Sequence, residues 1–211
     1  MITKKWVVGV LAVAAIGASL FFLLHKPTEK AEELAANVSE ALGLRAGEAV
    51  SKLLGNKGRV AVLEMEFKSG QAPTAVATVE MFQKTLKKHG VTVARTKALP
   101  GGLNALVMGG GVPRNDYVAL VEGSPSVDAV VTFAGLPNLP SDELQHFQAN
   151  HAPLVVVDIF GVLKGPALPS LVEQKTVVLA FVPRSATEVE KQGKEARMFE
   201  RYYKILMPPA K

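Results

Sequence analysis

The chain has 211 residues, of which 48% are hydrophobic and 20% charged, and it contains no cysteine. These values suit one ordinary domain with an additional segment, and they exclude a disordered, collagen-like or disulfide-stapled chain. Without cysteine the chain has no thiolate nucleophile, no cysteine metal site and no lipoprotein anchor.

The formal net charge of +5 is unevenly distributed along the chain. Residues 1–26 hold three lysines and no acidic residue, whereas residues 27–183 hold 14 basic and 15 acidic residues. Nucleic-acid-binding proteins concentrate Lys and Arg on the folded body. The near-neutral body of this chain therefore argues against a nucleic-acid partner.

A membrane segment is predicted within residues 1–26, because the nineteen residues from Trp6 to Leu24 carry no charge. A helix of that length spans about 28 Å, close to the thickness of a bilayer core. Lys4 and Lys5 place the short N-terminus in the cytoplasm and the rest outside, as in a single-pass protein of a bacterial inner membrane. A cleaved signal peptide is the alternative, but the apolar run continues past every small residue that a peptidase needs.

A helical linker is predicted over residues 27–58, beginning with Thr28 as its N-cap. Gly43 and Gly47 have low helix propensity and predict a break or two separate helices. The linker is interpreted as a stalk or as a helix folded onto the next domain. Alternatively, its Ala-rich surface packs against a protein partner.

An α/β domain is predicted over residues 59–184, where apolar β-branched runs alternate with amphipathic stretches. Such runs are typical of parallel strands buried on both faces, so we expect a three-layer fold with a mainly parallel five-stranded sheet of order 2-1-3-4-5. The predicted strands are Val60–Glu66, Val91–Lys97, Asp128–Phe133, Leu154–Ile159 and Thr176–Val182. The predicted helices are Ala72–His89, Arg114–Glu122, Ser141–Asn150 and Pro166–Glu173.

The C-terminal part, residues 185–211, is predicted to contain an amphipathic helix from Ala186 to Leu206. Its apolar seam is expected to pack against the sheet or against another chain. The basic and aromatic residues 201–204 also suit a nucleic-acid contact, but the predicted extracytoplasmic location disfavours it.

Three segments of this domain resemble one lobe of the type I periplasmic binding proteins and their repressor relatives. They are GRVAVLEMEF with the helix ending in KKHGVTVA, then SPSVDAVVTFAG, then HAPLVVVDIF. The resemblance covers residues 59–184 and implies a flavodoxin-like strand order. The family places its ligand cleft between two lobes and this sequence holds one, so a closing cleft would need a second chain.

A ligand site is predicted where the connections of such a sheet change direction, beyond the carboxyl ends of the first and third strands. Two loops and the end of a neighbouring strand are expected to meet there. Their candidate ligand-binding residues are Glu66, Lys68, Ser69, Gly135, Asn138 and Asp158.

Other motifs give little support for catalysis or for a cofactor. The glycines of Gly109–Arg114 lack the further residues of a dinucleotide or P-loop fingerprint and predict a turn before a helix. His146 and His151 belong to no metal-binding motif. Glu64 and Glu66 are two residues apart in a predicted strand, so they share a face, and two carboxylates on one face suit acid–base catalysis. Alternatively, Glu64 lies at the margin of the sheet or pairs with a basic residue such as Arg59 or Lys97.

Two functions are consistent with these observations. The first is a non-enzymatic, membrane-anchored accessory subunit of an envelope complex, whose linker and C-terminal helices bind protein partners or a second copy. The alternative is a small-solute-binding module of the periplasmic-binding-protein type, which rebuilds a cleft as a dimer. A hydrolase or transferase that uses Glu64 and Glu66 is a third and weaker hypothesis.

Overall fold

The structure is a computed structural model that describes residues 29–68, 70–102, 111–140, 142–145, 152–163, 167–192 and 197–209. Its contacts divide the chain into two compact units, Met1–Ala35 and Ala36–Lys211. The predicted membrane segment, residues 6–24, lies outside the described ranges. Within those ranges, no helix combines the length and the apolar character needed to cross a bilayer.

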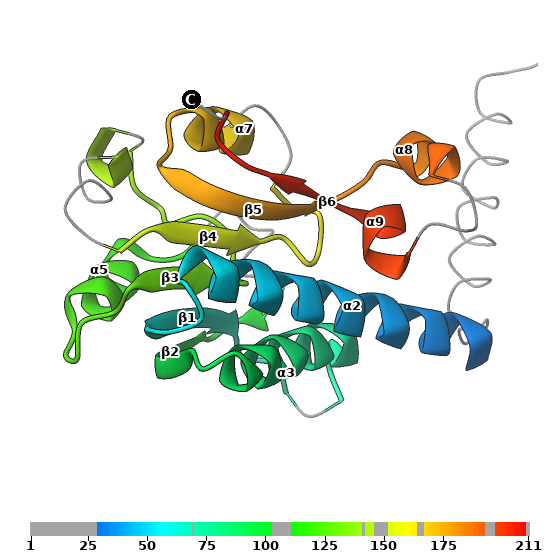
Figure 1. Cartoon of the computed structure of the whole chain (residues 1–211), viewed down its shortest axis with the longest axis horizontal. Coiled ribbons are helices and arrows are strands. Elements are labelled where there is room, and N and C mark those ends of the chain that lie inside the picture. The colour runs from blue at the N-terminus through cyan, green and yellow to red at the C-terminus, as the bar shows by residue number, and fades with distance from the viewer. Residues whose placement is uncertain are drawn as a thin grey trace, which may run out of the picture. The chain divides into compact units, whose positions relative to one another are not determined.

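A six-stranded sheet of order β2-β1-β3-β4-β5-β6 forms the centre of the second unit (Figure 1). The strands are β1 (Arg59–Met65), β2 (Thr92–Leu99), β3 (Ala129–Thr132), β4 (Leu154–Val157), β5 (Val177–Pro183) and β6 (Tyr203–Leu206). All neighbours pair in parallel except β6, which is antiparallel to β5. The five predicted strands and their order are confirmed. The predicted number of strands is wrong, because a sixth strand, β6, extends the sheet.

Helices cover the two faces of this sheet and give the domain its three layers. One apolar cluster joins one face of the sheet to α3 (Pro73–Lys88) and to the part of α2 (Glu29–Leu53) that follows Ala35. The other face packs against α5 (Arg114–Glu122) and α7 (Ala167–Glu173). The central strands β3 and β4 are buried at every residue, which explains their continuous runs of apolar side chains.

The predicted break in the linker is wrong, since α2 is one continuous helix of 25 residues. A Cβ atom on Gly43 would lie 2.3 Å from the Thr78 carbonyl oxygen, and one on Gly47 would lie 2.6 Å from the Thr85 Cβ. The two glycines therefore let α2 and α3 pack closely, and the packing offsets their low helix propensity. From Ala36 onward α2 is folded onto the domain (Figure 1).

The predicted C-terminal helix over 186–206 is also wrong. The described residues form α8 (Ala186–Lys191), α9 (Met198–Tyr202) and then β6, which pairs with the end of β5. Ser185 and Glu188 close a capping box that starts α8. Two apolar residues of the predicted seam, Phe199 and Tyr203, are nevertheless buried, and their rings stack with centroids 6.2 Å apart.

Candidate functional site

The parallel strands β1, β3 and β4 lie side by side, and their carboxyl ends meet at one edge of the sheet. After β1 the chain forms β2 on one side, and after β2 it forms β3 on the other side of β1. The connections therefore change direction between β1 and β3, which is where sheets of this kind bind ligands. The loops after these strands contain the residues predicted to bind a ligand.

Asp158, at the end of β4, is buried and fully engaged by its own loop. Its Oδ1 accepts a hydrogen bond from the backbone N–H of Val162 and its Oδ2 accepts one from that of Leu163, both at 3.1 Å. Burial raises the pKa of this carboxyl, and the backbone donors act in the opposite direction. The side chain holds the loop after β4, which includes Ile159 and Phe160, in one shape.

Gly135 and Asn138 also have structural partners in the loop after β3. The Thr132 hydroxyl donates to the Gly135 carbonyl at 2.8 Å, and the Asn138 backbone N–H donates to the Val112 carbonyl at 2.7 Å. The Asn138 side chain is exposed. A Cβ on Gly111 would lie 2.4 Å from the Leu136 carbonyl oxygen, so that glycine serves the close approach of two loops.

Glu66 and Lys68 follow β1 and line one open hollow of about 640 Å³ beside the start of α3. Both side chains are exposed. The third predicted residue of this loop, Ser69, lies outside the described residues. The structure thus brings Glu66 and Lys68 together, while Asp158 and Gly135 stabilise other loops of the same edge.

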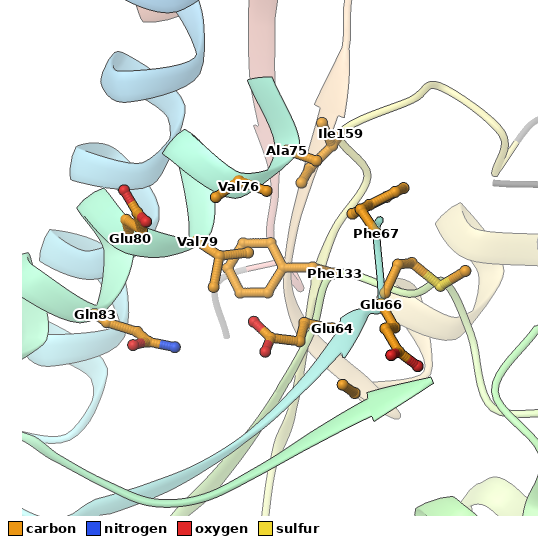
Figure 2. Close-up of a pocket in the computed structure, with 12 residues that line it drawn as sticks. Glu64, Glu66, Phe67, Ala75, Val76, Val79, Glu80, Gln83, Phe133 and Ile159 are labelled. Carbon is orange, nitrogen blue, oxygen red and sulfur yellow. The ribbon is translucent and has the colours of Figure 1, made fainter. Parts of the chain in front are cut away.

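Glu64 is the side chain that stands out at this edge. It lies on β1 on the same face as Val60 and Val62, which are both in the core beneath α2 and α3. Instead of a third core residue, Glu64 places a half-buried carboxylate in a hollow of about 370 Å³ between β1 and α3 (Figure 2). Burial raises the pKa of this carboxyl.

Among the described residues, the Glu64 carboxylate has no hydrogen bond and no ion pair. The predicted pairing with Arg59 or Lys97 is wrong. The Lys97 ammonium lies 3.1 Å from the Asp116 carboxylate, and the Arg59 guanidinium donates to the Ser126 hydroxyl. A carboxylate that is partly removed from water and has no partner is costly, so hydrogen-bond donors would stabilise it.

The walls of the Glu64 hollow are mostly apolar. Phe133, from the end of β3, forms one wall, and its ring packs edge-on against Phe82 with centroids 5.1 Å apart. Phe67 forms another and packs against Phe160 at 6.1 Å. Figure 2 shows the Gln83 amide of α3 and the Glu64 carboxylate pointing toward each other across the hollow.

Glu64 and Glu66 do not act as a facing pair. Figure 2 shows their carboxylates pointing in different directions, although both residues line the hollow. The strand β1 ends at Met65, so the alternation that places residues two apart on one face does not extend to Glu66. This arrangement removes the basis of the acid–base hypothesis.

One other sequence motif corresponds to a structural feature, and the histidine pair is not tested. The helix predicted to begin at Arg114 is confirmed, and the Arg114 guanidinium is held by the Glu143 carboxylate, with its Nε 2.9 Å from Oε1. His146 and His151 lie outside the described residues. Across the described ranges, no three His, Asp or Glu side chains converge as metal ligands.

No family model matches the sequence, and no curated protein does. Solved structures do match. A solute-binding protein of an ABC transporter from Burkholderia graminis, in complex with D-arabinose, has a TM-score of 0.54 at 14% identity, over 80% of this chain and 59% of that one. The XylFII molecule has a TM-score of 0.52 at 14% identity, over 81% of this chain and 61% of that one. The sugar-binding protein of a sugar ABC transporter from Bacillus halodurans has a TM-score of 0.50 at 15% identity, over 68% of this chain and 46% of that one.

These likenesses show the fold: the α/β domain resembles part of a solute-binding protein, and the predicted resemblance to one lobe of the periplasmic binding proteins is confirmed at the level of the fold. The chain spans 46% to 61% of the length of these three proteins.

Reasoning from sequence did not include Glu64, Gln83 and Phe133 among the candidate ligand-binding residues, although all three line the hollow. One signal was present in β1, where a glutamate follows two valines at alternate positions of an otherwise apolar strand. The position of Gln83 on the wall depends on how α3 packs over β1, and no local pattern indicates it.

Proposed function

We propose that the α/β domain is a non-enzymatic module that binds a small polar solute in the Glu64 hollow. The observation that carries this proposal is the half-buried Glu64 carboxylate, without a partner among the described residues, at the sheet edge where such folds bind ligands. A hollow of about 370 Å³ with apolar walls and a few polar groups is of the size and character of small-molecule sites.

The solved neighbours support this choice over an accessory subunit. Those with a TM-score of at least 0.50 include two whose names state solute or sugar binding. No contact in the described residues specifically favours the accessory-subunit hypothesis. The chain spans about half to three fifths of the length of these proteins. A second copy of the chain is the source that we propose for a second wall over the hollow.

The membrane arrangement belongs to the same proposal. With residues 6–24 as a single-pass anchor, the module would stand on the outer face of the cytoplasmic membrane, where it would meet solutes from outside the cell. Fractionation of native membranes tests this part separately: the full chain should remain in the membrane pellet after a high-salt wash. A full-length chain released by salt would contradict the anchor and leave the solute site untouched.

The solute site is tested by thermal unfolding with a panel of sugars, polyols, amino sugars and amines. A true ligand at 100 times its dissociation constant should raise the free energy of unfolding by about 2.7 kcal/mol. The variant Glu64→Gln should lose that gain while remaining folded. The matched control is Glu122→Gln, which removes the same charge from an exposed residue on α5, a helix packed on the opposite face. A panel in which nothing changes the unfolding of the wild-type chain would contradict the proposal.

A further inference from the structure

The polar lining of the Glu64 hollow is acidic. Three of its residues are glutamates, Glu64, Glu66 and Glu80, and the fourth polar one is Gln83. None of the described residues that line it is a lysine, arginine or histidine. This described lining therefore carries formal negative charge and supplies no cation to balance it.

The positive charge of α3 lies farther along the same helix. Lys84 and Lys87 line the adjacent hollow toward β2, which shares Glu80 and Gln83 with the first. Glu80, the acidic residue of α3, therefore lies nearer the carboxyl edge of the sheet than the two lysines do. The lysines lie in the last turns of α3, where cations are favoured by the helix dipole.

Glu64 differs from the two other glutamates because its backbone is fixed in the sheet and its side chain is partly removed from water. Glu66 and Glu80 are exposed, so water screens their charges. Glu64 extends from a strand paired on both sides, with Val79, Phe133 and Ile159 among its surroundings in the hollow. A donor that enters this hollow interacts with Glu64 in a medium of lower dielectric than water, where charge pairing is stronger.

We propose that the hollow selects solutes that carry an ammonium group, which pairs with the Glu64 carboxylate. This inference rests on the proposed solute-binding function and adds the chemical class of the ligand. An ammonium group supplies several N–H donors and balances the charge of Glu64, whereas a neutral hydroxyl supplies one donor and leaves that carboxylate charge uncompensated. Hydrogen bonds to a charged partner are also stronger than those between neutral groups.

The direct test is isothermal titration of the full-length chain in mild detergent with two matched pairs of probes. D-glucosamine and D-glucose differ at one position, which carries an ammonium group in the first and a hydroxyl in the second. Cadaverine and 1,5-pentanediol have no ring and differ in the same way at both ends of a five-carbon chain. The amine of at least one pair should bind about tenfold more tightly than its neutral partner, which corresponds to about 1.4 kcal/mol.

The variant Glu64→Gln should reduce binding of the preferred amine by about tenfold or more, the loss expected for one charge-assisted hydrogen bond. The control Glu122→Gln should leave it unchanged. Glu80→Gln should have a smaller effect than Glu64→Gln, because the Glu80 side chain is exposed. A melting temperature of Glu64→Gln that is no lower than that of the wild type shows that any loss is one of binding and not of folding.

The outcomes separate this inference from the function on which it rests. If only neutral probes or neutral members of the wider panel bind, the ammonium selectivity is wrong and solute binding stands. If amines bind equally well to the wild-type chain and to Glu64→Gln, the assignment of Glu64 as the partner is wrong. If nothing in the panel binds, both proposals are overturned.

Discussion

Glu64 and Asp158 are two acidic side chains near the carboxyl ends of β1 and β4, two parallel strands separated by β3, and burial raises the pKa of both. Their partners differ. The Asp158 carboxylate accepts two backbone N–H groups from its own loop. The Glu64 carboxylate lies in an open hollow without a partner among the described residues.

This difference shows why burial of an acid does not by itself indicate a binding site. A carboxylate whose acceptors are occupied by backbone donors stabilises a loop and has little capacity left for a ligand. A carboxylate without donors lowers the stability of the folded chain and regains that free energy when a ligand supplies them. Substitution should therefore have opposite effects on stability at the two positions.

The largest effect on stability is expected for Asp158→Ala. This substitution leaves the backbone N–H groups of Val162 and Leu163 without their acceptor, and it should lower the free energy of unfolding by about 1 to 3 kcal/mol. Urea denaturation measures the change. Asp158→Asn keeps one acceptor oxygen and should cost less. If both variants are as stable as the wild type, Asp158 is not the support of its loop, and the contrast with Glu64 fails.

A smaller change of opposite sign is expected for Glu64→Gln in the absence of ligand. Removing a half-buried charge that has no partner should raise the free energy of unfolding by about 0.5 to 1 kcal/mol. The same denaturation experiment on Glu122→Gln should show almost no change, because that side chain is exposed. A clear loss of stability in Glu64→Gln would mean that the carboxylate has a structural partner.

Much of the fold could be predicted from the sequence because its central strands are buried on both faces. The runs that became β3 and β4 are continuous and apolar, and such runs indicate parallel strands without any tertiary information. The strand order followed from the alternation of strands with helices and from the resemblance to one lobe of a binding protein.

Two other elements could not be predicted locally, because partners distant in sequence determine them. Gly43 and Gly47 lower helix propensity, but in the folded chain they contact α3, which lies more than thirty residues farther along the sequence. Residues Tyr203–Leu206 fit the apolar seam of a helix by spacing, but they pair with the free edge of β5 as a strand. In both cases tertiary packing overrides propensity.

The candidate site could be predicted only as a region. The change in direction between β1 and β3 indicates the edge of the sheet at which the hollow of the proposed site lies. It does not indicate which polar side chains at that edge are already satisfied. The loop after Asp158 folds back so that two of its backbone N–H groups donate to the Asp158 carboxylate. The chain after Glu64 supplies no such donor among the described residues. That distinction depends on the shape of the loop backbone, which no motif in this chain encodes.

The smallest effect concerns pH and isolates Glu64 from the other acids. Its folded-state pKa is raised, so the folded chain binds that proton more tightly than the unfolded chain does. This contribution to stability is fully present below the ordinary glutamate pKa of about 4.3 and is lost as the pH rises through the folded-state value. The extra stability of Glu64→Gln over the wild type should therefore be largest near neutral pH and shrink toward about pH 4.

Other acidic groups with shifted pKa values are common to both proteins, so their contributions cancel in the difference. The pKa of Asp158 is also raised. The pKa of Glu188 is lowered to about 2 by the Lys204 ammonium and the groups of Ser185. Urea denaturation of the two proteins at several pH values measures this difference, and a difference that stays constant with pH would show that Glu64 ionises as a solvated side chain does.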